Sequence, residues 1–199
     1  MSARGYARQA GTAALVLAAL GAGRAVTTMF PVDDSASEPF LRPTDVGETV
    51  ELRYADITAA EVDGSTRISN AGTGLQTTEV FLVIPVTIEA TGEPATLSYA
   101  AVHDRDGTTY VANGSRSQFS PGLAQPGLPR YATVTVELPA DAVAGAHLRV
   151  ALNADSRRDD MADIDLSLTG TDAKRWAERT EVLTVPTPSE KPPGDEERS

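Results

Sequence analysis

Two histidines and two groups of aspartates are the side chains of this sequence best suited to chemistry. His103 stands next to Asp104, whereas His147 has no acidic neighbour along the chain. A histidine and an acid serve nucleophilic hydrolases, but the sequence has no Gly-x-Ser-x-Gly elbow. It also lacks cysteine and the His-Glu-x-x-His pattern, which are common sources of zinc ligands. We therefore interpret both histidines as surface residues at strand ends, and we predict no catalytic residue, no metal-ligating residue and no cofactor.

The two acidic loops have the composition of calcium ligands. The segment 104–107, Asp-Arg-Asp-Gly, opens like a calcium loop but lacks the glutamate at the twelfth position, so a hairpin turn explains it better. The second loop mixes acids and bases: Asp155, Asp159, Asp160 and Asp163 with Arg157 and Arg158. We expect these charges to neutralise one another, and calcium binding is the alternative.

A short helix is predicted near the C-terminus. Thr171 or Asp172 can cap a helix over residues 173–178, which contains the one tryptophan of the chain, Trp176. So short a helix is not stable alone and must dock. We expect the Trp176 ring to pack the helix onto the rest of the domain, and a contact with a partner protein is the alternative.

The remaining elements alternate apolar and polar residues with a period of two, which is typical of strands with one buried face. Residues 80–88 are apolar on both faces, so this segment belongs in the middle of the core. Pro85 within it cannot donate a backbone hydrogen bond, which predicts an edge, a bulge or a change of partner there. Further strands are expected in segments 50–54, 97–101, 108–111, 131–138, 147–152, 164–168 and 181–185. Short strands separated by turns favour an all-β fold, a β-sandwich.

Four segments in this order resemble a known family. They are Val46-Gly-Glu-Thr-Val50, the strand 80–88, Asp104-Arg-Asp-Gly107 with Thr109-Tyr110, and Pro126-Gly127 before the strand that ends Glu137-Leu-Pro139. Together they cover roughly residues 45–153 and resemble bacterial exported domains of unknown function, related to a mycobacterial immunoprotective secreted antigen. The resemblance implies an immunoglobulin-like antiparallel β-sandwich without a known catalytic site. Pro85 departs from the family's smooth strand, and the helix near Trp176 lies outside the resemblance.

The N-terminus has the order of an export signal, in which basic residues precede an apolar segment. Arg4 and Arg8 precede the uncharged residues 9–23, and apolar character resumes after Arg24 through residue 32. We expect a retained membrane anchor, because this continuation brings the segment to the length that spans a bilayer. A cleaved signal peptide is the first alternative and a cytosolic helix the second. Either exported form leaves the basic flank inside the cell and the bulk of the chain outside.

These observations predict four regions. A hydrophobic helix, as signal-anchor or signal peptide, occupies 1–32, and a polar stalk follows over 33–44. The β-sandwich with its short helix spans 45–186, and a proline-rich tail that we expect to be disordered occupies 187–199. The absence of cysteine excludes disulfides and a lipid anchor on cysteine.

The composition narrows the class of function. The net charge of −11 repels nucleic acid and anionic headgroups. Arginine outnumbers lysine 15 to 2, which we interpret as a bacterial coding bias. We expect no enzyme but a single-pass protein of the cell membrane, with its C-terminal domain extracytoplasmic, that acts in protein interaction or as an accessory of an envelope complex. Its partner would be an envelope or membrane protein, and the alternative is a secreted binder of a small ligand or a calcium ion.

Overall fold

The computed structural model describes residues 38–155 and 159–192. The predicted N-terminal helix, Arg157, Arg158 and the end of the predicted tail lie outside the described residues. Within the described part, no helix has the length and apolar character needed to span a membrane. The strands are β1 (Phe40–Asp45), β2 (Thr49–Glu51), β3 (Ala55–Ala59), β4 (Asp63–Asn70), β5 (Thr73–Ala90), β6 (Tyr99–His103), β7 (Thr109–Val111), β8 (Arg130–Leu138), β9 (His147–Ala151), β10 (Asp160–Asp165) and β11 (Val182–Val185). A single 3₁₀ turn, η2 (Ala140–Ala142), and a helix, α2 (Gly170–Glu178), complete the described elements.

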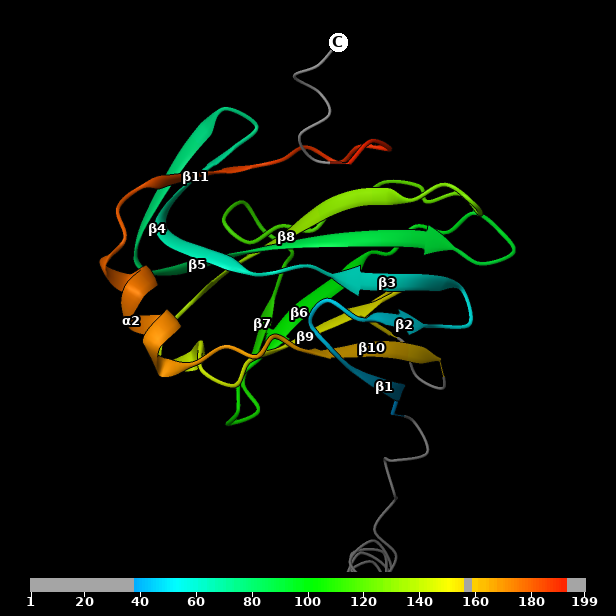
Figure 1. Ribbon diagram of the computed structural model, residues 1–199, viewed down its shortest axis with the longest axis horizontal. Helices are drawn as coiled ribbons and strands as arrows, with labels where there is room; N and C mark the ends of the chain where they lie inside the picture. The colour runs from blue at the N-terminus through cyan, green and yellow to red at the C-terminus, as the bar shows by residue number, and fades with distance from the viewer. Residues whose placement is uncertain (1–37, 156–158, 193–199) are drawn as a thin grey trace, which may run out of the picture. The chain divides into compact units, whose positions relative to one another are not determined.

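The strands form two sheets (Figure 1). Sheet A has the order β1-β10-β9-β6-β7, and sheet B has the order β11-β4-β5-β3-β2, with β8 on the other side of β5. The side chains that alternate inward from both sheets make one shared hydrophobic core, as in a β-sandwich. Its fully buried members include Val80, Leu82, Ile84, Ile88, Val102, Leu148, Val150 and Ile164. The described part is therefore a β-sandwich with one helix, as the sequence predicted.

Both sheets are mixed, which corrects the expectation of purely antiparallel pairing. The strand β1 runs parallel to β10, and β11 runs parallel to β4. Each parallel pair joins a strand near one end of the described chain to a strand more than a hundred residues away. Parallel neighbours need a long connection between them, and these pairs have one. Local alternation carries no information about such distant partners, so the sequence did not indicate them.

Pro85 lies where β5 changes partners, as one of the predicted alternatives stated. Along the same edge of β5, β4 pairs as far as Val83 and β3 begins at Val86. The Pro85 carbonyl still accepts a hydrogen bond from the Ala60 N–H at 2.9 Å. Because the missing N–H of Pro85 falls in the gap between two partner strands, it deprives neither strand of a ladder bond.

The strand β1 begins inside the segment that was expected to be a polar stalk. Residues 40–44 pair with β10, and Phe40 and Leu41 remain exposed at this sheet edge. Pro43 in its middle has no N–H to offer a further strand, which protects the edge from unwanted pairing.

The helix α2 begins three residues earlier than predicted and has a different cap. The Thr169 hydroxyl accepts the N–H groups of Thr171 and Asp172, and the Asp172 carboxylate accepts the Thr169 N–H at 2.9 Å. This reciprocal capping box satisfies several of the free N–H groups of the first turn. Neither Thr171 nor Asp172 is therefore the N-cap residue.

The Trp176 ring is buried, which confirms that it packs the helix onto the domain and contradicts the partner-contact alternative. Only 1% of its surface is exposed. The ring lies directly against Gly64 of β4, where a Cβ atom would come within 2.5 Å of a ring carbon. Beyond the helix, the Arg179 carbonyl accepts hydrogen bonds from the hydroxyls of Ser65 and Thr66. The helix is thus fixed to β4 by its ring and by its C-terminal end.

Candidate functional site

The two histidines of the sequence analysis lie opposite each other on neighbouring strands of sheet A. His103 of β6 is in register with His147 of β9, and both are partly exposed. The Thr109 hydroxyl lies 3.2 Å from His103 Nδ1, and the buried Nε2 has no partner among the described residues. Burial, and then the nearby Arg149 guanidinium, lower the pKa of His103 below its usual value, which keeps the ring neutral near pH 7. Pairing of strands, not sequence spacing, brings these two rings together.

An arginine binds the aspartate that lies beside the two histidines on sheet A. Asp163 accepts the Arg149 Nε–H at 2.9 Å, and His147 Nδ1 lies 3.8 Å from the same carboxylate oxygen. In the described ranges, no three His, Cys, Asp or Glu residues are close enough to hold a metal ion. The histidine pair lies beside the Arg149–Asp163 ion pair on the surface of sheet A.

The first acidic loop closes a hairpin between β6 and β7, in agreement with the hairpin interpretation. One carboxylate oxygen of Asp104 accepts the N–H groups of Asp106 and Thr108, at 2.9 and 2.8 Å. Burial alone would raise the pKa of Asp104, but these hydrogen bonds outweigh it and hold the pKa below its usual value. The carboxylate is thus used by the turn itself.

The aspartates of the second loop form ion pairs with arginines from other strands. Asp159 binds the Arg53 guanidinium at 2.8 Å, and Asp160 binds Arg42 at 3.0 Å. These arginines lie about a hundred residues away in the chain. Arg157 and Arg158, the local partners expected from the sequence, lie outside the described residues.

Tyr54 fixes the second loop from inside. Its hydroxyl donates to the Asp160 carbonyl at 2.8 Å and accepts the Leu152 N–H at 3.1 Å. Burial of the ring is the main reason that the pKa of Tyr54 rises to about 12. This side chain links the two sheets and holds the loop end of β9 against β10, which is a structural role.

The outer face of sheet B, opposite to the shared core, is apolar along β5 and falls into two halves. In the closed half, Phe81 and Val83 pack with Ile68 of β4 and Val185 of β11 in a second buried cluster. The pairing of β4 with β5 skips several β5 residues between Gln76 and Phe81, and such an irregularity bends strands. The Arg116 guanidinium lies 5.3 Å from the Phe81 ring centroid, which completes the cover.

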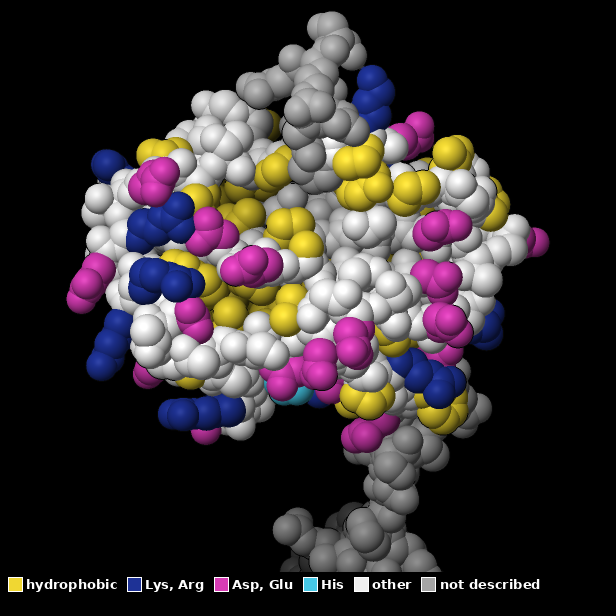
Figure 2. Space-filling model, in the orientation of Figure 1, with side chains coloured by type: hydrophobic (Ala, Val, Ile, Leu, Met, Phe, Trp, Pro, Cys, Tyr) yellow, Lys and Arg dark blue, Asp and Glu magenta, His cyan; other side chains and the backbone are white. Residues whose placement is uncertain are grey.

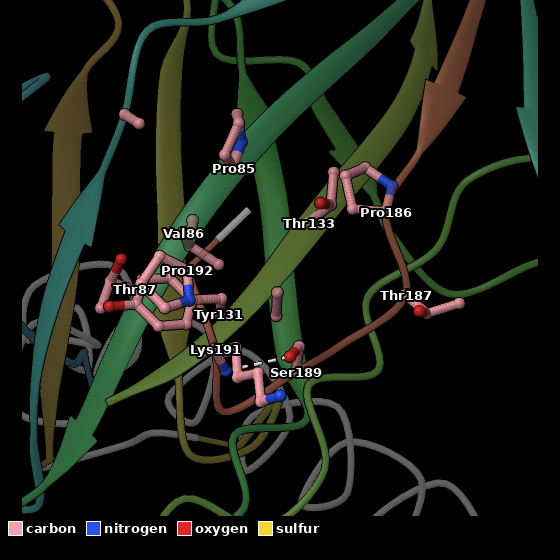
Figure 3. Close-up of a pocket in the computed structure, with 12 residues that line it drawn as sticks. Pro85, Val86, Thr87, Tyr131, Thr133, Pro186, Thr187, Ser189, Lys191 and Pro192 are labelled. Carbon is pink, nitrogen blue, oxygen red and sulfur yellow. Dashed lines mark hydrogen bonds between the residues drawn. The ribbon is translucent and has the colours of Figure 1, made fainter. Parts of the chain in front are cut away.

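The open half contains a hollow of about 410 Å³ (Figure 3). The floor of the hollow is the outer face of sheet B, with Pro85 and Thr87 from β5 and Tyr131 and Thr133 from β8. Residues 186–192, which we call the C-terminal strap, form a wall of the hollow above this floor. Further lining residues are Ala60, Val86, Ala132, Pro186, Thr187, Ser189, Lys191 and Pro192. The lining is mostly apolar, with a few hydroxyl groups and one lysine, which is the usual composition of a small-molecule site.

The strap has few attachments. Tyr131 and Ser189 exchange two backbone hydrogen bonds of 2.8 and 2.9 Å. One ion pair, Arg130 with Glu190, spans 3.8 Å. A second hollow of about 190 Å³ lies on the other side of the strap and shares Thr133, Pro186 and Thr187 with the first. Residues 187–192, expected to belong to a disordered tail, thus have defined contacts on sheet B.

Acidic side chains predominate over β2 and β3 on the face drawn in Figure 2, whereas arginine and lysine gather around α2. The apolar hollow of the outer face of sheet B is the candidate functional site. Sequence reasoning missed this site. The available signals were the apolar odd-numbered residues of β5 and the four prolines between residues 186 and 193, which we interpreted as core and mainly as disorder.

Comparison with known proteins assigns no role to this site. No protein-family model matches the chain, and no curated protein matches it. Among solved structures, the yjhA protein from Bacillus subtilis is 16% identical, covering 61% of this chain and 99% of that one with a TM-score of 0.45. An uncharacterized β-sandwich protein from Clostridium difficile 630 is 11% identical, covering 63% and 95% with a TM-score of 0.42. The β-sandwich assignment made above rests on the two sheets of this chain.

Proposed function

We propose that this protein is a non-catalytic binding module of the cell envelope. In this proposal the N-terminal segment holds the chain in the cell membrane as a single span, and the β-sandwich lies outside the cytoplasm. There it binds an envelope or membrane protein and serves as an accessory of that complex. The chain would belong with the exported immunoglobulin-like domains that its sequence resembles.

One observation carries the binding role. The apolar outer face of sheet B is closed over Phe81 and Val83 but stays hollow over Pro85 and Thr87. An apolar face costs free energy where it meets water, and uncovered apolar surface on a soluble domain marks a place of contact. A strap held mainly by the Tyr131–Ser189 bonds can move aside for a partner.

The proposed membrane location and the proposed relationship to immunoglobulin-like domains are supported by the sequence alone. The order of basic, apolar and polar residues in 1–32 supports export with retention. The four segments between residues 45 and 153 support the relationship.

Two measurements test the proposal. Protease added to intact cells should digest the domain while the chain stays in the membrane fraction. Pull-down from detergent-solubilised membranes with the full chain should capture a protein that a Tyr131→Glu variant loses and an Arg149→Glu variant, on sheet A, retains. A soluble secreted product, or a captured protein that both variants retain, would contradict the proposal.

The alternative function, a secreted binder of a small ligand, is favoured by the size of the hollow. Its volume of about 410 Å³ falls within the range of about 300–1,000 Å³ that is usual for small-molecule sites. The calcium form of this alternative has less support, because Asp159, Asp160 and Asp163 are each bonded to an arginine.

A further inference from the structure

We propose that the hollow beneath the C-terminal strap binds a small apolar molecule that carries one carboxylate, with the Lys191 ammonium as its counter-charge. The inference rests on the proposed role of the chain as a binding module, and it assigns that role a ligand chemistry. Three features of the hollow carry it: its lining, its charge and its mobile wall.

The lining selects an apolar body. Pro85, Pro186 and Pro192 present rings without hydrogen-bond donors, and Tyr131 adds an aromatic surface (Figure 3). Water in the hollow finds few hydrogen-bond partners on such walls. An apolar chain or ring that fills the hollow therefore releases unfavourably placed water. The hydroxyl of Thr87, beside Tyr131 and Pro192, offers one hydrogen bond for orientation.

The charge selects an anionic group. Lys191 is one of only two lysines in a chain of net charge −11, and it lines the hollow. Its backbone N–H donates to the Ser189 hydroxyl at 2.9 Å, which fixes the turn that carries it. Among residues 38–155 and 159–192, no ion pair involves its ammonium group, whereas the nearby Glu190 already faces Arg130. A carboxylate on the ligand would supply the missing partner.

The strap gives a route of entry. Only the Tyr131–Ser189 pair of backbone bonds and the long Arg130–Glu190 pair tie it to β8. Local opening that breaks so few bonds has a low free energy compared with unfolding. A ligand can therefore enter without disturbing the core, and the strap can close over it.

The test uses octanoate as the probe and 1-octanol as its uncharged counterpart. Isothermal titration calorimetry would be run on the full chain in a non-ionic amphipol. Thr87→Trp fills the hollow from its floor, and Ala60→Phe fills it from an exposed rim position. Thr184→Trp, on the exposed face of β11, is the matched control for both, since Thr184 does not line the hollow. Lys191→Gln removes the charge, and Lys174→Gln removes the same charge from α2.

We expect octanoate to bind the wild type with a Kd of about 0.1–1 mM, as its few atoms allow. Either filling variant should weaken binding by more than about tenfold, and Thr184→Trp should not. Lys191→Gln should weaken it by about threefold to fivefold, the usual effect of a partly exposed ion pair, while Lys174→Gln leaves it unchanged.

Two results overturn the inference. The first is that octanoate does not bind the wild type, or binds both filling variants equally well. The second is that octanol binds as tightly as octanoate and Lys191→Gln has no effect, because the ligand would then need no carboxylate. The pull-down separates the two proposals. If the chain captures its protein partner but does not bind octanoate, only the proposed ligand is refuted. If it binds octanoate but captures no partner, only the proposed protein partner is refuted.

Discussion

The helix α2 and the C-terminal strap lie on either side of β11 in the chain and both contact sheet B, yet they are held in different ways. The helix buries Trp176 against Gly64, is capped by Thr169, and ends in hydrogen bonds to β4. The strap buries no large side chain and is tied to β8 by the Tyr131–Ser189 bonds. The contrast indicates that two segments in contact with the same sheet can have very different local stabilities.

The difference follows from what each segment removes from water. The Trp176 ring and its contact with Gly64 can be exposed to water only if the sandwich itself opens, so α2 should unfold with the domain. Two backbone hydrogen bonds offset only part of the cost of ordering the strap's residues, so the strap should open by itself. The hollow lies beneath the segment that can open, which makes it accessible to a ligand or partner.

Removing the ring of Trp176 should have the largest effect. We expect Trp176→Ala to destabilise the protein by about 3–5 kcal/mol, because it deletes a fully buried aromatic side chain and leaves a cavity. Urea unfolding followed by far-UV circular dichroism measures the loss. The native fluorescence of the single tryptophan should be blue-shifted in the wild type. A loss below about 1 kcal/mol would mean that α2 is no better fixed than the strap.

Adding one carbon at Gly64 should have the next largest effect. The new Cβ atom would overlap the Trp176 ring, and we expect Gly64→Ala to cost about 1–3 kcal/mol by overpacking. Gly74→Ala, also in sheet B, is the matched control, since no atom lies within 4 Å of its added Cβ. Equal unfolding midpoints for the two variants would refute the close contact.

The helix cap should make a smaller, pH-dependent contribution. Hydrogen bonds from the Thr169 hydroxyl and backbone N–H are the main reason that the pKa of Asp172 lies below its usual value. A carboxyl with a lowered folded-state pKa stabilises the fold above its ordinary pKa of about 3.9, and this stabilisation is lost as the pH falls through the folded value. Asp172→Asn should therefore cost roughly 0.5–1 kcal/mol at about pH 7 and less at about pH 3. A thermal unfolding difference that is equal at both pH values would contradict this assignment.

Deleting residues 187–199 should have the smallest effect, below about 1 kcal/mol. Each lost backbone hydrogen bond is worth about 0.5–1.5 kcal/mol, while each freed residue regains about 1–2 kcal/mol of backbone entropy. A deletion of 181–199 is the control, because it also removes β11 and the buried Val185 and should cost more. If the short deletion costs as much as the long one, the strap is an integral part of the fold.

The sequence predicted the regions in which local pattern decides structure. Alternation in 131–138 and the two apolar faces of 80–88 predicted strands and their place in the core. Pro85 predicted an edge, a bulge or a change of partner, because a missing N–H has a limited set of structural consequences, and the structure shows the change of partner. The burial of Trp176 followed from its size and from the shortness of its helix.

The candidate site was not predictable in this way, because it depends on distant pairing. Nothing near Tyr131 indicates that Ser189 will lie beside it, and nothing near β4 indicates that β11 will join it in parallel. A proline-rich tail has too little apolar surface to order itself, so the sequence alone favoured disorder. Its order here depends on a sheet face that the rest of the chain supplies.

Amide hydrogen exchange on the full chain tests the central claim most directly, since it reports the opening of each segment under native conditions. The relevant donors are the N–H groups of Tyr131 and Ser189 for the strap, and those of Ala173 and Thr66 for α2 and its contact with β4. We predict that the Tyr131 and Ser189 amides exchange at least about 100-fold faster than the Ala173 and Thr66 amides, because opening the strap breaks only a few bonds. Equal protection of all four amides would contradict the account, because the strap would then open only when the whole domain unfolds.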